Sequence, residues 1–127
     1  MRSEQEILKD IERISKEFYA KSPSVTGNWD TYDEFLAVEE DLIKQVYEID
    51  KEVGEGVKVG RLIQIPYADG YALYWITKIT KSSVHTNWIP YGDAWQSPVV
   101  SERGVCPMRI ATEYIRMADW RRNLRKS

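Results

Sequence analysis

The chain has 127 residues, of which 43% are hydrophobic and 30% charged, with a formal net charge of −2. This is the composition of one folded globular domain, and it excludes an intrinsically disordered chain. No apolar run approaches the roughly 20 residues that span a bilayer, and the polar N-terminus is unlike a signal peptide, so a cytoplasmic protein without membrane contact is expected. The single Cys106 excludes an intrachain disulfide framework and a cysteine-based zinc site.

The first predicted element is an amphipathic helix. Ser3 followed by Glu6 is a capping-box pattern, in which each side chain satisfies a free backbone amide at the helix start. Apolar residues follow at helical spacing on one face: Ile7, Ile11, Ile14 and Phe18. Proline and glycine within residues 22–30 then predict a break.

A second helix is predicted to follow this break. Thr31 and Glu34 form another capping-box pattern, and Gly54 and Gly56 are typical of the residues that follow a helix C-terminus. One face of the segment between them carries Phe35, Leu42, Val46, Ile49 and Val53, with Leu36, Ile43 and Tyr47 beside it. Since the connecting loop is short, we expect an antiparallel helical hairpin over residues 1–56.

The composition then changes to one typical of strands. Residues 57–67, 71–80 and 84–90 are rich in Val, Ile, Thr, Tyr and Trp, and the turn signals between them have hairpin length. Residues 97–100 and 104–106 fit two further short strands. A short antiparallel meander of this kind usually hides its edges by curling into a small barrel of the SH3-like type.

The middle strand is apolar on both faces. Leu73, Trp75 and Ile79 lie on one face, and Tyr74 and Ile76 lie on the other. One face is expected to fill the barrel and the other to lie under the helices, and the pattern leaves open which is which.

The predicted fold is therefore α+β, as a single domain over residues 1–127. Two N-terminal helices precede the small SH3-like antiparallel barrel at 57–106, and a C-terminal helix at 107–127 packs on it. Pro107 suits the first residue of that helix. Its outer face is basic, with Arg109, Arg116, Arg121, Arg122, Arg125 and Lys126.

Three segments together resemble the Tudor domains, small barrels of the Royal group. KVGRLIQIPYADG (58–70) is similar to their first strand and turn, and VHTNWIPYGD (84–93) to their third strand and closing turn. YALYWITKI (71–79) stands where the family has an aromatic residue followed by a strand. The resemblance covers about 36 of the 127 residues.

The resemblance implies an aromatic cage for a methylated lysine or arginine. The four cage positions of the family fall on Tyr67, Tyr74, Trp88 and Tyr91, with Asp93 at the rim. A methylated cation has fewer hydrogen-bond donors and more apolar surface, so water holds it less well. Aromatic faces attract it, each contributing roughly 0.5–2 kcal/mol.

Other functions stay open. Trp88 and Tyr91 can instead pack beneath the N-terminal helices, while Trp95 is expected to cover the open end of the barrel. The basic last helix and the barrel aromatics suggest nucleic-acid binding as an alternative. The basic helix can instead pair with the acidic N-terminal half of the chain, which would leave it unavailable to nucleic acid. A protein-interaction or homodimerisation module is a third interpretation, supported by Trp29 and Trp120.

No catalytic centre is predicted. His85 and Cys106 are the only residues of their kinds, but no third group that would orient such a pair is suggested. No phosphate-binding loop, metal-ligand cluster or cofactor motif is present. The sequence thus favours a non-catalytic binding module with an aromatic pocket for a cationic small molecule or peptide.

Overall fold

The computed structural model describes residues 2–67, 69–92 and 95–115. The elements are α1 (Glu4–Lys21), α2 (Pro23–Thr26), the 3₁₀ helix η1 (Trp29–Thr31), α3 (Tyr32–Val53), β1 (Leu62–Tyr67), β2 (Gly70–Ile79), β3 (Ser83–Ile89) and β4 (Val105–Pro107). A further helix begins at residue 108 and is described through residue 115. The predicted α+β class is confirmed. Within this described part of the chain, no helix has the length and apolar character needed to cross a membrane.

The two long helices begin differently. Ser3 accepts a hydrogen bond from the Glu6 backbone, and Glu6 accepts one from the Ser3 backbone, so the predicted capping box of α1 is confirmed. The capping box predicted at Thr31 is wrong, because no side chain caps α3. The Thr31 hydroxyl donates to the carbonyl of Asn28 at 2.8 Å instead, within the short 3₁₀ turn that precedes α3.

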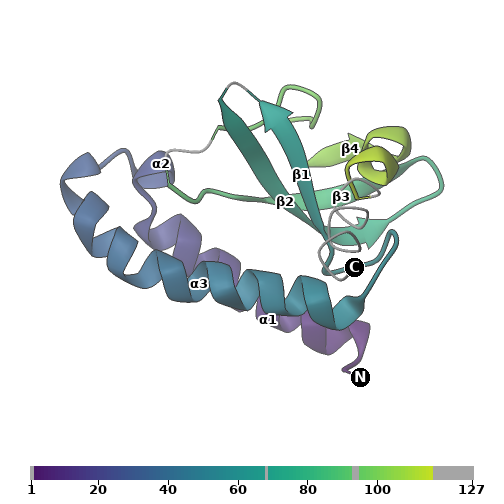
Figure 1. Ribbon diagram of the computed structural model, residues 1–127, viewed down its shortest axis with the longest axis horizontal. Coiled ribbons are helices and arrows are strands. Elements are labelled where there is room, and N and C mark those ends of the chain that lie inside the picture. The colour runs from purple at the N-terminus through teal and green to yellow at the C-terminus, as the bar shows by residue number, and fades with distance from the viewer. Residues whose placement is uncertain (1, 68, 93–94, 116–127) are drawn as a thin grey trace, which may run out of the picture.

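The four strands form one antiparallel sheet in the order β1-β2-β3-β4. The sheet is curled into a half-barrel, which is compatible with a small SH3-like barrel (Figure 1). The strand predicted over residues 97–100 is wrong: this segment is a turn. The first strand begins at Leu62 rather than at residue 57, and Pro107 ends β4 just before the last described helix.

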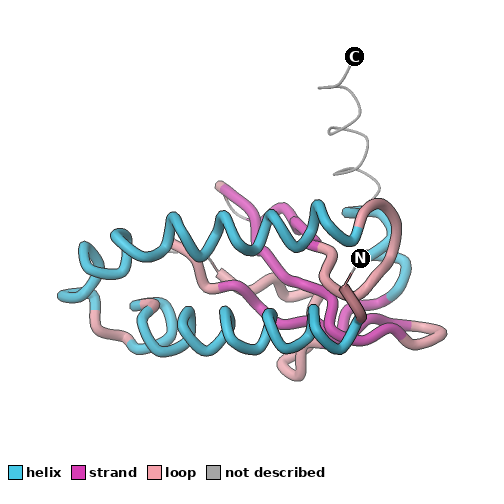
Figure 2. Tube along the Cα trace, turned by 90° about the horizontal axis from the view of Figure 1, so that it is seen from below, coloured by secondary structure: helices cyan, strands magenta, loops and turns pink. Residues whose placement is uncertain are grey.

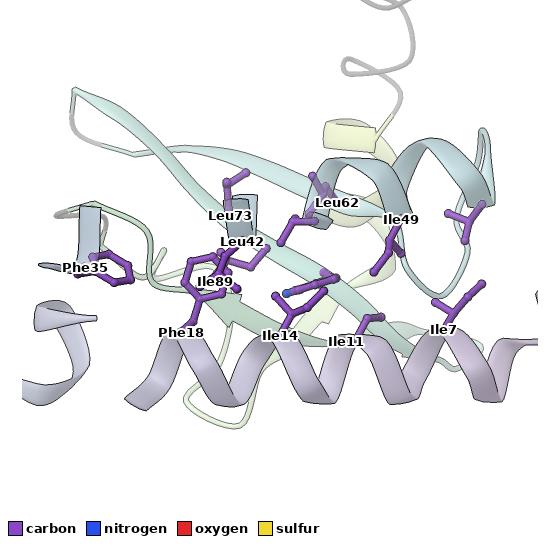
Figure 3. Close-up of a cluster of buried hydrophobic side chains, with 13 residues drawn as sticks. Ile7, Ile11, Ile14, Phe18, Phe35, Leu42, Ile49, Leu62, Leu73 and Ile89 are labelled. Atoms are coloured by element: carbon purple, nitrogen blue, oxygen red, sulfur yellow. The ribbon is translucent and has the colours of Figure 1, made fainter. Parts of the chain in front are cut away.

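Helices α1 and α3 run side by side across one face of the sheet (Figures 1 and 2). The predicted apolar face of each helix is buried against the sheet, whereas Leu36 and Tyr47, predicted beside the face of α3, are each 43% exposed. Figure 3 shows Ile7, Ile11, Ile14 and Phe18 pointing from α1 toward the strands. Phe18 meets Phe35 of α3 edge to face, with ring centroids 6.3 Å apart. The sheet contributes Leu62, Leu73, Trp75 and Ile89 to this cluster, which we call the helix-facing side.

The opposite face of the sheet carries a second cluster, the loop-facing side. Its buried residues are Ile63, Ile65, Ala72, Tyr74, Ile76, Val84, Val100, Cys106, Ala111 and Ile115. The middle strand is thus buried on both faces, as its sequence predicts. Ile79 departs from the prediction and is 40% exposed, because a β-bulge between Ile76 and Lys78 shifts the register at that end of β2.

A buried ion pair ties the end of α3 to the start of β1. Arg61 is fully buried and donates from Nε to Asp50 Oδ1 at 2.7 Å, and from a terminal nitrogen to the Gly54 carbonyl at 2.6 Å. Asp50 also accepts from the Leu62 backbone N–H at 2.9 Å. Since β1 is an outer strand of the sheet, this last bond satisfies one of its outward-facing amides, and Pro66 has no amide proton to offer there.

Candidate functional site

The structure brings two of the predicted cage residues together. Tyr74 of β2 is the direct partner of Trp88 of β3, and Ile63 of β1 completes the row on the loop-facing side. Tyr74 is only 2% exposed, and its phenolic oxygen accepts a hydrogen bond from the Ser97 backbone at 2.7 Å. Burial raises the pKa of Tyr74, and the bond from Ser97 offsets part of that rise. Tyr74 therefore lies buried at the base of the site and does not line its sides.

Trp88 is the more accessible member of this pair. Its side chain is partly buried against the loop-facing cluster, and its indole Nε1 is shielded without a hydrogen-bond partner. Its backbone carbonyl accepts from the hydroxyl of Tyr19 on α1 at 3.0 Å. This bond fixes the backbone of β3 against α1 while the indole lies on the other side of the sheet.

Tyr67 lies on the same side but at a distance. It is 42% exposed and pairs with Gly70 at the tip of the β1–β2 hairpin. Four residues of strand separate it from Ile63, which corresponds to about 13 Å. A cation attracted by a ring lies within about 6 Å of it, so Tyr67 and Trp88 do not surround one methylated group.

Tyr91 lies on the other side of the molecule. It packs against the helix-facing cluster, and its turn is fastened to the helical hairpin by side chains. Ser22 donates to the carbonyl of Pro90 at 2.6 Å, and Ser24 donates to the carbonyl of Gly92 at 3.1 Å. The carboxylate of Glu39 accepts from the Gly92 backbone. The turn thus joins the helices to the sheet, and its tyrosine is part of that junction.

The remaining predicted rim residue, Asp93, lies outside the described residues. Trp95 does not cover the open end of the sheet as expected, since its side chain is 70% exposed. Two residues further on, Ser97 is buried and holds Tyr74. Trp95 is therefore an exposed ring on the segment that crosses the loop-facing side.

The other chemistry considered from the sequence finds little support. Cys106 is buried with Val84 on the loop-facing side, and burial raises the pKa of its thiol to about 11. His85 follows Val84 in β3 and so points to the opposite face. Across residues 2–67, 69–92 and 95–115, no three His, Cys, Asp or Glu side chains are placed to hold a metal ion. Apart from Arg109, the basic face of the last helix lies beyond the described residues.

Sequence reasoning missed the side chains that hold this region in place. Ser22 and Ser24 stand in a segment that reads only as a helix break, and Glu39 reads as one of many exposed helix carboxylates. Their partners are more than 50 residues away in the chain, so no local pattern marks them. The sequence predicts Ser97 to lie in a strand, and no sequence pattern marks it as a hydrogen-bond partner of Tyr74.

No family model matches this chain, and no curated protein or solved structure shows significant similarity to it.

Proposed function

We propose that this protein is a non-catalytic binding module that recognises a cationic group at Trp88. The observation that supports this proposal is that Trp88 stays partly open beside buried Tyr74, on the side of the sheet that α1 and α3 do not cover. An aromatic face at a partly desolvated position attracts a methylated or quaternary ammonium through its quadrupole. Such a cation has little hydration to lose, so an aromatic face can compete with water for it.

The spacing of the rings favours a peptide as the ligand. Tyr67 is about 13 Å along β1 from the row that contains Trp88. Tyr67 is also two strands away from Trp88, which adds about 10 Å across the sheet. An extended peptide that places a methylated side chain on Trp88 can therefore reach Tyr67 with residues about five positions away. Asp69, exposed at the hairpin tip beside Tyr67, adds a negative charge there. Tyr91 is not a ligand contact in this proposal, because it packs against the helices.

Calorimetry with two matched peptides tests the proposal. One peptide carries trimethyllysine, and the other carries its uncharged carbon isostere, which has the same shape but no positive charge. We expect the charged peptide to bind about two- to thirtyfold more tightly, since one ring contributes roughly 0.5–2 kcal/mol to cation binding. Equal affinity for the two peptides would refute recognition of the cation.

A pair of tryptophan variants locates the site. Trp88→Ala should abolish binding of the trimethyllysine peptide. Trp29→Ala is the matched control, because Trp29 is 49% exposed in η1, where the helical hairpin turns, and should leave the affinity unchanged. Titrating salt separates this function from nucleic-acid binding, whose affinity falls steeply with ionic strength.

A further inference from the structure

A second concave surface lies between α1 and the sheet, separate from Trp88. This groove has a volume of about 490 Å³, within the range of sites that take small molecules. One stripe of α1 forms one wall, and the ends of β2 and β3 form the other. Its lining residues are Leu8, Ile11, Glu12, Ser15, Lys16, Tyr19, Thr77 and Asn87.

Ser15 is the residue that marks this groove as more than a packing gap. It is only 8% exposed, and its hydroxyl has no hydrogen-bond partner among the residues that the structure describes. A buried hydroxyl left unpaired destabilises a protein. Buried hydroxyls therefore usually have a hydrogen-bond partner, and unpaired ones are rare. Rotation about one side-chain torsion can turn this hydroxyl toward a group that enters the groove, without any backbone movement.

The facing strands present groups of complementary kinds. Asn87 carries a carboxamide, which both donates and accepts hydrogen bonds. The hydroxyl of Thr77 donates to the His85 carbonyl at 3.3 Å and so can accept from a ligand. The hydroxyl of Tyr19 is engaged by the Trp88 carbonyl, which leaves its ring, 38% exposed, as a flat wall. These groups suit a ligand with alternating hydroxyl groups and C–H faces.

The charges of the groove cancel. Among the described residues that line it, Glu12 and Lys16 are the charged ones, and they pair with each other at 3.3 Å. The groove therefore offers no net attraction to an anion or a cation. Its polar groups instead match a neutral molecule.

We propose that this groove binds a neutral polyhydroxylated molecule of about the size of a sugar. The ligand hydroxyls would pair with Ser15 and Asn87, and an apolar ligand face would lie on Tyr19. This site is independent of the cation site proposed at Trp88, so either can fail without the other.

The test is an NMR titration of the full-length ¹⁵N-labelled protein with glucose, sucrose and myo-inositol. We expect at least one of them to shift the Asn87 side-chain amide in a saturable way, with a Kd below about 10 mM and no dependence on salt. Glucose 6-phosphate and glucosamine serve as charged counterparts of glucose and should bind no more tightly than glucose. If none of the three neutral probes moves the Asn87 amide, the proposal is overturned.

Two variants make the result specific. Ser15→Ala removes the unpaired hydroxyl, so it should raise the Tm of the free protein by about 3 °C and weaken sugar binding at least tenfold. Asn87→Asp should weaken binding to a similar degree. Gln64→Glu is its matched control, an amide-to-acid change on β1 outside the groove, and should have no effect on binding. A lower Tm for Ser15→Ala, or unchanged binding by Asn87→Asp, would contradict the assignment.

Discussion

The two sides of the sheet differ in what covers them, although the same strands supply both. On the helix-facing side, two long helices seal Trp75, which is fully buried. On the loop-facing side, a turn, the 95–100 segment and a helix from residue 108 cover the cluster, and Trp88 remains partly open. Alternation along β2 and β3 therefore produces two apolar faces, and within the described residues α1 and α3 cover one of them continuously.

This difference suggests a division of roles. The helix-facing side concentrates the long apolar side chains, the aromatic contact between Phe18 and Phe35, and the buried ion pair of Asp50 with Arg61. The loop-facing side has a smaller core and exposed rings at Tyr67 and Trp95. We infer that the first side provides most of the stability, with the groove beside Ser15 at its margin, and that the second side leaves Trp88 open to a cationic ligand.

The largest expected effect compares the two tryptophans. Trp75→Ala should lower the free energy of unfolding by about 4 kcal/mol, because it leaves a large cavity in the sealed core. Trp88→Ala should lower it by only about 1 kcal/mol, since its ring is already partly hydrated. Urea denaturation followed by circular dichroism measures both. Equal losses would remove the distinction between the two sides.

The buried ion pair gives the next effect. Asp50→Ala leaves the guanidinium of Arg61 without its carboxylate in a position with 0% exposure, so a loss of about 3 kcal/mol is expected. Asp10→Ala is the control, because the pair of Asp10 with Arg2 is about one third exposed and should contribute less than about 1 kcal/mol. If both variants lose the same small amount, Arg61 is hydrated and the helix-facing side is not sealed there.

On the loop-facing side, a smaller effect is expected from Tyr74→Phe. The substitution removes the oxygen that accepts from the backbone of Ser97, itself 3% exposed, and should destabilise the protein by about 1 kcal/mol. Tyr47→Phe removes a hydroxyl from a 43% exposed ring that accepts from Gln64, so its effect should be a few tenths of a kcal/mol. Hydrogen exchange of the Ser97 amide should accelerate in the first variant only.

The last effect is absent at neutral pH and appears only as the pH becomes alkaline. The folded protein holds Cys106 as a thiol with a pKa raised to about 11 by burial, while the unfolded thiol ionises near about 8.5. The stabilisation is complete below the unfolded pKa and is lost as the pH rises through the folded pKa. Denaturation of the wild type and of Cys106→Ala from pH 8 to pH 11 should show a steeper decline in the wild type. Parallel declines would mean that the thiol is already accessible to solvent.

Local patterns predicted the helix-facing side well. The capping box at Ser3 and the stripe from Ile7 to Phe18 depend on residues three or four positions apart, and the structure has both. The apolar faces of β2 were also readable, but the bulge that exposes Ile79 was not, since a bulge depends on the partner strand. Thr31 does not cap α3 because its hydroxyl donates to the Asn28 carbonyl in the preceding 3₁₀ turn.

The site was harder to predict, for a physical reason. The resemblance names Tyr74 and Trp88 together as cage positions, and the structure places Tyr74 beside Trp88 in one row of the sheet. The position of Tyr91 depends on the hydrogen bond that Ser22 donates to Pro90 and on the one that Glu39 accepts from Gly92. Ser22 and Glu39 are separated from Tyr91 by tens of residues. Such tertiary contacts leave no periodic signal, so an aromatic residue beside a turn cannot be assigned to a pocket or to a core from sequence alone.

The most direct test compares the indoles of Trp75 and Trp88 during titration with tetramethylammonium. The indole N–H resonances are observed by ¹H–¹⁵N NMR and assigned with single Trp→Phe variants. We predict a saturable shift of the Trp88 resonance and none of the Trp75 resonance. A Trp88 resonance that does not move, or shifts of equal size at both indoles, would contradict the account.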